Sequence, residues 1–363
     1  MFGDVPAGWA PARMGQRQMK SPNPFSGGVD ALSDADFALL VDAVETRRCR
    51  ELVGAGTYDE AARKWRPRPR CPSCSYEGCA SDGSTPAGHR AWSCGRCGRK
   101  FNSLTGTVFE NAKRALWRWV VFIRLMCFNV QLDACAELCG ISHQTAWEWR
   151  HRVMATVDGY QDRIVLGGKV WIDEMYVTDS DLKGDPGWRP KKGLSKNKIC
   201  IAVAIDARKN VVAVRCGHGK PSAKRIKEAL LPHIAEGSEI FHDMEKSHRS
   251  LVEAVRGIDR PCKADTRDPE YLEHMAMVNN LCSWVRRYLR GYVGMDLKYL
   301  QSYLNWYAYL FRVKRDDEKW PKVERVLRHL FMADASFRSS RKRDNPYTGR
   351  LSKFQNMAEY REG

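Results

Sequence analysis

Four cysteines in the first third of the chain have the side-chain type and spacing of a metal site. Cys71 and Cys74 form one CxxC pair, and Cys94 and Cys97 form a second. The two-residue gap lets both thiolates of a pair bind one tetrahedral ion, and two pairs complete a closed site with four thiolate ligands. A pair of redox motifs is the alternative, but the βαβ pattern expected around such motifs is missing here. The spacing therefore predicts a structural Zn²⁺ in a zinc ribbon.

The remaining cysteines among the 13 are scattered singly along the chain. The amino-terminal segment has no apolar core of the kind that directs export, so we expect an intracellular protein with reduced thiols. Free cysteine is usually a small buried residue, and we assign the scattered ones to the core. Cys79 and His89 lie between the two CxxC pairs and are alternative ligands for the ion.

Two strand-like segments each carry an aspartate in apolar surroundings. Trp171–Val177 reads WIDEMYV and contains Asp173 and Glu174, and Ile240–Asp243 reads IFHD. A carboxylate in a central strand is costly unless it is paired or bound to a metal. Alternation along the strand sends Asp173 and Glu174 to opposite faces, so only one of them belongs to a given site. Each aspartate alone could instead be a capping or paired residue. Aspartates that converge from two strands favour Mg²⁺, and two such ions can promote phosphodiester cleavage.

The segment from Leu132 to Val153 predicts two helices joined by a turn at Gly140, with Ser142 as the N-cap of the second helix. This pattern favours a DNA-binding helix-turn-helix, and an ordinary αα-hairpin is the alternative. We expect the second helix to turn Ala146, Trp147 and Val153 inward. Its exposed residues would reach base edges and phosphates: His143, Gln144, Glu148, Arg150, His151 and Arg152. Of these, His143, Gln144, Arg150 and Arg152 are our candidate DNA contacts.

The charge of the chain favours a polyanionic partner. Its 363 residues carry a formal net charge of +17, and a hydrophobic content of 43% excludes wholesale disorder. Two segments, Lys183–Lys198 and Arg338–Lys353, are rich in lysine and arginine. A basic surface kept for solubility is the alternative explanation. In the first of these segments, the candidate DNA contacts are Arg189, Lys191 and Lys192.

Residues after Gly168 predict an α/β domain with the order β-β-β-α-β-α followed by helices. The expected strands are Lys169–Val177, Lys198–Ile205, Val211–Cys216 and Ser238–Asp243. The expected helices are Pro221–Ala235, Lys246–Val255, Glu270–Arg290 and Asp296–Arg312.

Several motifs occur in an order that is more specific than any one of them. They are RPRCPSC, WSCGRCGRKFNSLTGTVFE, GISHQTAWEWRHRV, WIDEMYV, IFHDMEKSH and HMAMVNNLCSWVRRYLRGYVGMDLKYLQSYLNWY. Together they resemble the bacterial insertion-sequence DDE transposases with an ISXO-two-like catalytic domain (the fifteen-ninety-five group, relatives of the eukaryotic Merlin elements). The resemblance covers about residues 60–313. It implies a ribonuclease H-like fold that cuts transposon ends and joins their 3′-hydroxyls to target DNA.

The resemblance also implies roles for individual residues. Asp173 takes the first acidic position and Asp243 the second, while the third falls on Asn279, as in subgroups that use asparagine. These three are the expected Mg²⁺ ligands. The basic residue seven positions later, usually lysine, is Arg286, on the same helical face as Asn279. Glu273 is the competing third ligand, but in one continuous helix it would lie about 120° away from the face of Asn279.

We therefore expect a multidomain α/β protein whose catalytic domain has a mixed, ribonuclease H-like sheet. Residues 1–32 are expected to form a disordered lead-in, 33–66 a short helical segment and basic linker, and 67–110 the zinc ribbon. Residues 111–162 are expected to form the helix-turn-helix region, 163–313 the DDE-type catalytic domain, and 314–363 a basic tail.

The predicted function is that of a DNA transposase with two catalytic Mg²⁺ or Mn²⁺ ions and one structural Zn²⁺. Its expected partners are double-stranded transposon ends and target DNA, with a homodimer or larger assembly on DNA and no membrane. The cytoplasm or nucleoid of a bacterium, or the nucleus of a eukaryote, is the expected compartment. Two other functions stay open: a domesticated, catalytically weak DNA-binding regulator, and a metal-dependent nuclease without strand transfer.

Overall fold

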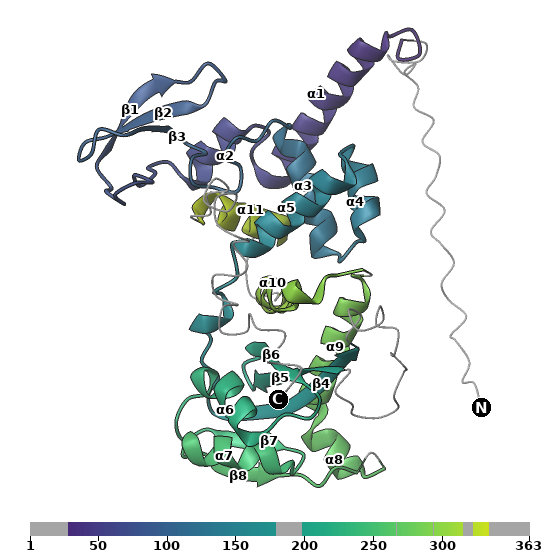
Figure 1. Ribbon diagram of the computed structural model, residues 1–363. Coiled ribbons are helices and arrows are strands. Elements are labelled where there is room, and N and C mark those ends of the chain that lie inside the picture. Colours follow the sequence, from purple (N-terminus) through teal and green to yellow (C-terminus); the bar gives the residue numbers. More distant parts are fainter. Residues whose placement is uncertain (1–27, 179–197, 266, 293, 315–321, 334–363) are drawn as a thin grey trace, which may run out of the picture. The chain divides into compact units, whose positions relative to one another are not determined.

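The computed structural model describes residues 28–178, 198–265, 267–292, 294–314 and 322–333 (Figure 1). The described residues divide into two units, with the boundary between residues 45 and 46, inside helix α1 (Asp34–Val53). Across the described ranges, no helix combines the length and the apolar character needed to cross a bilayer. Most of the expected lead-in, residues 1–27, lies outside the described residues.

The second unit contains a mixed sheet of five strands in the order β6–β5–β4–β7–β8. β4, β5 and β6 are antiparallel neighbours, whereas β7 runs parallel to β4 and β8 parallel to β7. Four of the strands lie where the sequence predicts them. The sequence does not predict β8, because its four residues are exposed and only one of them, Ile258, is a typical strand residue. The strands are β4 (Lys169–Thr178), β5 (Lys198–Asp206), β6 (Val211–His218), β7 (Glu239–His242) and β8 (Ile258–Pro261).

Both faces of this sheet are covered by helices, as Figure 1 shows. On β4, Ile172 packs into a core with α6 (Ala223–Leu230) and α7 (Lys246–Ala254), whereas Met175 joins a core with α9 (Ala276–Arg290) and α10 (Leu300–Val313). Alternation along the strand separates these two cores. Consequently Asp173 belongs to the α9 face and Glu174 to the α7 face.

The single helix predicted over Glu270–Arg290 is wrong. The chain forms α8 (Pro269–His274) and then α9, and Met275 between them has φ −95° and ψ 3°. Pro269 at the first turn of α8 and Asp268 as its N-cap fix that short helix separately. Glu273 and Asn279 therefore lie on different helices, and the angle expected between them in one helix does not apply.

The helical region combines segments from both ends of the described chain. Helices α2 (Tyr58–Trp65), α3 (Leu116–Cys127) and α11 (Lys322–Met332) pack together, with the rings of Trp65 and Phe331 5.4 Å apart. Two expectations are thereby corrected. Trp65 is a buried helical residue rather than part of a basic linker, and residues 322–332 form a packed helix rather than a basic tail. Residues 334–363 of that tail lie outside the described residues.

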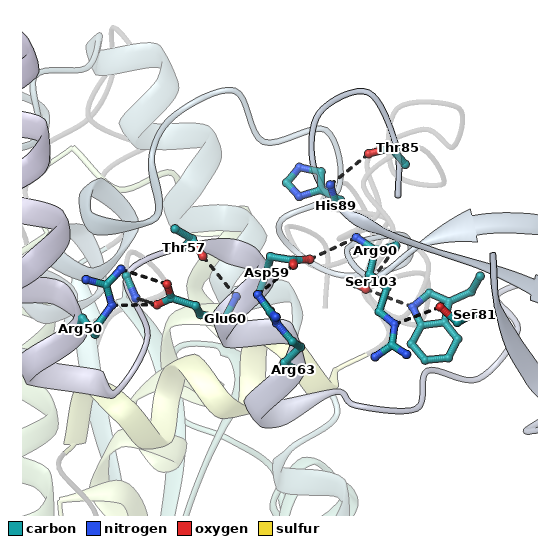
Figure 2. A network of polar contacts seen from close by, with 12 residues as sticks. Arg50, Thr57, Asp59, Glu60, Arg63, Ser81, Thr85, His89, Arg90 and Ser103 are labelled. Atoms are coloured by element: carbon teal, nitrogen blue, oxygen red, sulfur yellow. Dashed lines mark hydrogen bonds and ion pairs between the residues drawn. The ribbon is translucent and has the colours of Figure 1, made fainter. Parts of the chain in front are cut away.

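The two CxxC pairs lie beside a small antiparallel sheet that is attached to α2. Its strands are β1 (Cys79–Ser84), β2 (Arg90–Cys94) and β3 (Lys100–Asn102). The amide of Arg90 donates to Asp59 Oδ1 at 3.1 Å, and Arg63 forms an ion pair with the same carboxylate at 3.2 Å (Figure 2). Because Asp59 belongs to the first turn of α2, this network fixes one end of the small sheet to the helical region.

Candidate functional site

Asp173 and Asp243 lie at matching positions next to each other in the large sheet. In the parallel pair of β4 with β7, Trp171 is opposite Phe241, and each aspartate follows two residues later. Side chains separated by two residues share a face, and neighbouring strands lie about 4.8 Å apart. Both carboxylates therefore converge on the α9 face at the carboxyl end of β7, where ligand sites of such sheets commonly lie.

The environment of Asp173 favours binding of a cation. Burial and the negative charge of Asp243 raise the pKa of Asp173 to about 6, although the amide of Glu174 donates to Asp173 Oδ1 at 2.7 Å and opposes the shift. A carboxylate whose pKa is raised by a neighbouring carboxylate is stabilised in its ionised form when a positive ion lies between the two. Carboxylate oxygens are the ligands that Mg²⁺ and Mn²⁺ accept, so this pair fits a divalent ion.

Helix α9 contributes the residues expected at the third position. Cys282 directs its Sγ toward Asp173 Oδ2 at 3.7 Å, which places this side of α9 over the first carboxylate. Asn279 is half-buried one turn before Cys282, and Arg286 is exposed one turn after it. Glu273 is exposed at the end of α8. The fold thus brings Asn279 to the carboxylate side of the helix, with an amide oxygen available as a neutral metal ligand.

Tyr271 of α8 also belongs to this site and was not singled out in the sequence. Burial and the charges of Asp173 and Asp243 raise its pKa, whereas the Asn279 side chain lowers it. The Tyr271 hydroxyl therefore interacts electrostatically with both carboxylates and by hydrogen bonding with the Asn279 amide. The sequence contains no signal for this role, because a tyrosine in a short amphipathic helix is usually a packing residue.

The part of the chain that contains this sheet and both aspartates matches a known protein family. The family model of the ISXO2-like transposase domain matches residues 165–312, which include the whole five-stranded sheet and helices α6 to α9. Residues 165–312 belong to this family. The resemblance predicted from the motifs is therefore confirmed.

The transposase domain and the residues before it also have a relative in Halobacterium salinarum. The uncharacterized protein of transposable element ISH50 is 28% identical over 287 residues, covering 72% of this chain and 90% of the relative. Among solved structures, a pre-cleavage Mos1 transpososome matches with 14% identity, a TM-score of 0.21 and coverage of 57% of this chain and 75% of that chain. A mariner Mos1 paired end complex with Mg matches with 13% identity, a TM-score of 0.24, and coverage of 59% and 78%.

Ahead of the transposase domain, the four predicted cysteine ligands converge into one group, the four-cysteine group. Cys71, Cys74, Cys94 and Cys97 have sulfur atoms that all lie within 4.8 Å of one another, and three of the distances are 3.6 Å. Tetrahedral zinc with Zn–S bonds of about 2.3 Å requires sulfurs roughly 3.8 Å apart. The geometry therefore fits one Zn²⁺.

The surroundings of the cysteines also fit a thiolate site. The amide of Ser73 donates to Cys71 Sγ and the amide of Arg96 to Cys94 Sγ, each at 3.4 Å. Against the effect of burial, backbone N–H donors lower the pKa of Cys94 to about 6. Neither alternative ligand belongs to the group: Cys79 Sγ donates to a backbone carbonyl, and the ring of His89 meets the edge of Tyr58.

The predicted helix pair and its turn are present as α4 (Leu132–Cys139) and α5 (His143–Ala155). Gly140 ends α4 in the left-handed conformation with φ 56°. The Ser142 hydroxyl accepts a hydrogen bond from the amide of Thr145 and caps α5. The turn chemistry is thus confirmed, whereas a DNA-binding role for this pair stays a prediction.

The predicted orientation of α5 is wrong for two residues on its exposed face, Arg150 and His151, and for Trp147 on its inward face. Arg150 and His151 are buried, and Trp147 is only half-buried while Trp149 faces the core. Arg150 donates to the Val130 carbonyl at 3.0 Å and its guanidinium lies over the Tyr292 ring. The carbonyl and the ring stabilise the buried guanidinium by a hydrogen bond and a cation–π contact, so Arg150 is not available to DNA.

The other candidate DNA contacts have different positions. His143 and Gln144 are exposed in the first turn of α5, where His143 lies 3.4 Å from Asp133 and Gln144 donates to Glu148. Arg152 is half-buried. The three candidates in the basic segment, Arg189, Lys191 and Lys192, lie outside the described residues.

Proposed function

We propose that the chain is a DDE-type DNA transposase. In this role it binds transposon ends, cleaves them in a reaction that depends on divalent metal ions, and joins the 3′-hydroxyl ends to target DNA. The observation that carries the proposal is the convergence of Asp173 and Asp243 on one face of the sheet within a domain of the ISXO2-like transposase family. The sheet order also supports a ribonuclease H-like fold, since three antiparallel strands are followed by two parallel ones.

The residues around the carboxylates support this chemistry. Asp173, Asp243 and the amide oxygen of Asn279 would hold divalent ions, which supply an activated nucleophile and neutralise the leaving oxygen of the phosphodiester. Arg286 is exposed one turn beyond Cys282 on α9, where its planar guanidinium can bind a phosphate oxygen of the DNA in bidentate fashion. Because Asp173 is half-buried, water screens its interaction with a divalent ion less than at an exposed position.

The parts before the catalytic domain would bind DNA. The four-cysteine group would hold Zn²⁺ and stabilise the small sheet, and exposed His143 and Gln144 at the start of α5 would contact base edges. The net charge of +17 supports a double-stranded DNA partner. Two ends must be brought together for transposition, so we propose a dimer or larger assembly on DNA.

A cleavage assay tests the proposal. The full chain is incubated with Mg²⁺ or Mn²⁺ and duplexes that carry the DNA flanking its gene, and nicked and joined products are separated. We expect Asp173→Asn and Asp243→Asn to abolish both products and to leave end binding intact. Glu239→Gln is the control, because this carboxylate lies at the opposite end of β7 in an ion pair with Arg260.

The products separate the competing functions. End binding without cutting by the unaltered chain favours a regulator that has lost catalysis. Cutting without joined product favours a nuclease that lacks strand transfer. Cutting that survives both aspartate substitutions overturns the assignment of the site.

A further inference from the structure

A buried histidine connects the two faces of the catalytic sheet. His248, in the first turn of α7, has an exposed fraction of 1%. Its Nε2 lies 2.9 Å from Oε1 of Glu174, whose side chain is 6% exposed. Its Nδ1 lies 3.5 Å from Oδ1 of Asp243. The ring therefore extends from the acid on the α7 face to a candidate catalytic carboxylate.

The two ring nitrogens have different partners. Since an ionised carboxylate only accepts, the contact with Glu174 places a proton on Nε2, and in the neutral ring Nδ1 then carries the lone pair. Nδ1 is buried and forms no hydrogen bond, although a carboxylate oxygen faces it. Asp243 Oδ1 is itself an acceptor, and its hydrogen bond comes from the amide of Glu245 at 3.2 Å. In the neutral ring, Nδ1 and Asp243 Oδ1 are two facing acceptors in a buried position, which is unfavourable unless a proton or a metal ion lies between them.

The spacing fits a metal ion better than a proton. A charge-assisted N–H···O⁻ bond would bring the atoms to about 2.7–2.9 Å. Two ligands of one ion, each with bonds of about 2.1 Å, are instead roughly 3.0–3.4 Å apart. Metal-binding histidines also commonly donate their second ring nitrogen to a carboxylate, as His248 does to Glu174.

The neighbouring histidine lacks this arrangement. His242, together with Asp243 and His248, has possible ligand atoms within 4.8 Å of the others. Its ring meets that of His248 at 90° with 5.0 Å between centroids. Its Nε2 lies 2.8 Å from Asp259, and its Nδ1 accepts from the amide of Met244 at 3.2 Å. Both nitrogens of His242 are therefore occupied, which makes it a matched control for His248.

We propose that His248 Nδ1 is a further ligand of the metal ion held by Asp243, and that Glu174 orients it for this role. The proposal rests on the proposed function and adds a nitrogen ligand to an otherwise oxygen site. Mg²⁺ strongly prefers oxygen ligands, whereas divalent ions of the first transition row, such as Mn²⁺, also accept an imidazole nitrogen. The ion at Asp243 is therefore expected to be Mn²⁺ in preference to Mg²⁺.

The direct test is a spectroscopic measurement on the DNA-free full chain. Mn²⁺ is titrated in and its binding followed by loss of the free-ion electron paramagnetic resonance signal. Electron spin echo modulation then reports whether a nitrogen is bonded to the ion. We expect nitrogen modulation in the unaltered chain, its loss in His248→Gln and its retention in His242→Gln. The glutamine at 248 can keep a donor for Glu174 but lacks the ring nitrogen at the Nδ1 position.

Affinity provides a second measurement that does not depend on cleavage. Glu174→Gln should weaken Mn²⁺ binding by about 10- to 100-fold, since loss of an orienting partner typically has this effect. Asp243→Asn should remove the ion, and circular dichroism verifies the fold of each variant.

Bound Mn²⁺ that depends on Asp243 but shows no nitrogen modulation overturns the histidine ligand and leaves the transposase function standing. Absence of bound Mn²⁺, or modulation that is lost only in His242→Gln, also overturns it. Cleavage that is insensitive to Asp243→Asn overturns the function itself.

Discussion

Trp171 of β4 and Phe241 of β7 are directly paired across the parallel strands, and their rings stack with centroids 5.0 Å apart. This pair lies two residues before both candidate catalytic aspartates and on the same face of the sheet. The Trp171 indole N–H also donates to the His274 carbonyl at 2.7 Å, which links the pair to the end of α8. The stacked pair thus fixes β4 and β7 to each other two residues before the carboxylates and helps to position them.

Removing one ring of this pair should lower the rate of DNA cleavage more than the affinity for transposon ends. Phe241→Ala is expected to lower the free energy of unfolding by about 1–3 kcal/mol, since the ring is half-buried, and to reduce the cleavage rate at least tenfold. End binding should change little. Phe311→Ala, a half-buried ring on α10, is the control for the loss of stability alone. Equal cleavage rates for the two variants would contradict a positioning role of Phe241.

Burial of His151 should make stability depend on pH. Burial and the charge of Arg150 lower the pKa of His151 to about 4. Between this value and the ordinary value of about 6.5, the unfolded chain binds a proton that the folded chain does not. Stability should therefore fall as pH is lowered through this window, by up to about 3 kcal/mol from this group.

Urea unfolding at pH 7 and pH 4.5 measures this effect. His151→Phe should reduce the difference in unfolding free energy between the two pH values, because the phenyl ring takes up no proton. His143→Phe is the control, since that side chain is 61% exposed. An unchanged pH difference in His151→Phe would show that other groups cause it.

Arg150 should contribute to folding rather than to DNA binding. Its guanidinium donates to the Val130 carbonyl and lies over Tyr292. Arg150→Ala removes both contacts from a buried site and should cost about 2–4 kcal/mol of stability. At temperatures where the variant is folded, the dependence of DNA affinity on salt should match that of the unaltered chain. Gln144→Ala, at an exposed position of α5, is expected to show the reverse: normal stability and weaker DNA binding.

The sequence predicted best what local chemistry determines. Gly140 and Ser142 specify a turn and a cap by their own conformational and hydrogen-bonding preferences, and the apolar runs of β4 to β6 allow few alternatives to buried strands. Helix α11 was predictable too: its apolar residues recur with helical spacing, but the basic residues around them obscured the pattern. The periodic residues are Val323, Val326, Leu327, Leu330 and Phe331.

Features that depend on tertiary contacts were not predictable. Arg150 has the type of a DNA contact, and only the packing of α5 against Tyr292 places it inside the fold. The link between Glu174 and His248 joins residues far apart in the chain, although both occur in motifs that were recognised. The break at Met275 depends on how α8 meets the sheet, through the carbonyl of His274. In each case the local pattern is compatible with more than one structure.

One zinc ion per chain is expected at the four-cysteine group. Metal analysis of the purified chain should find it, and Cys94→Ser combined with Cys97→Ser should abolish it. Because structural zinc contributes folding free energy, the double variant should also lose protection of the small sheet against proteolysis. Cys79→Ser, whose sulfur lies outside the group, should retain the metal. Zinc content that is unaffected by the double substitution would place the ion elsewhere.

The third position of the catalytic site provides the most discriminating substitution. Asn279 lies on the carboxylate side of α9, one turn from the Cys282–Asp173 contact, whereas Glu273 is exposed on α8. Asn279→Ala should therefore reduce metal-dependent cleavage by about 10²-fold or more, because an oxygen ligand is lost, and Glu273→Ala should leave it nearly unchanged. Asn279→Asp keeps an oxygen ligand and adds a negative charge. Unlike Asn279→Ala, it should therefore retain cleavage, and it should lower the Mg²⁺ concentration required for the half-maximal rate. The measurement is the initial rate of nicking against Mg²⁺ concentration for the three variants, with end binding as the control. Loss of cleavage in Glu273→Ala with normal rates in Asn279→Ala would transfer the third position to Glu273.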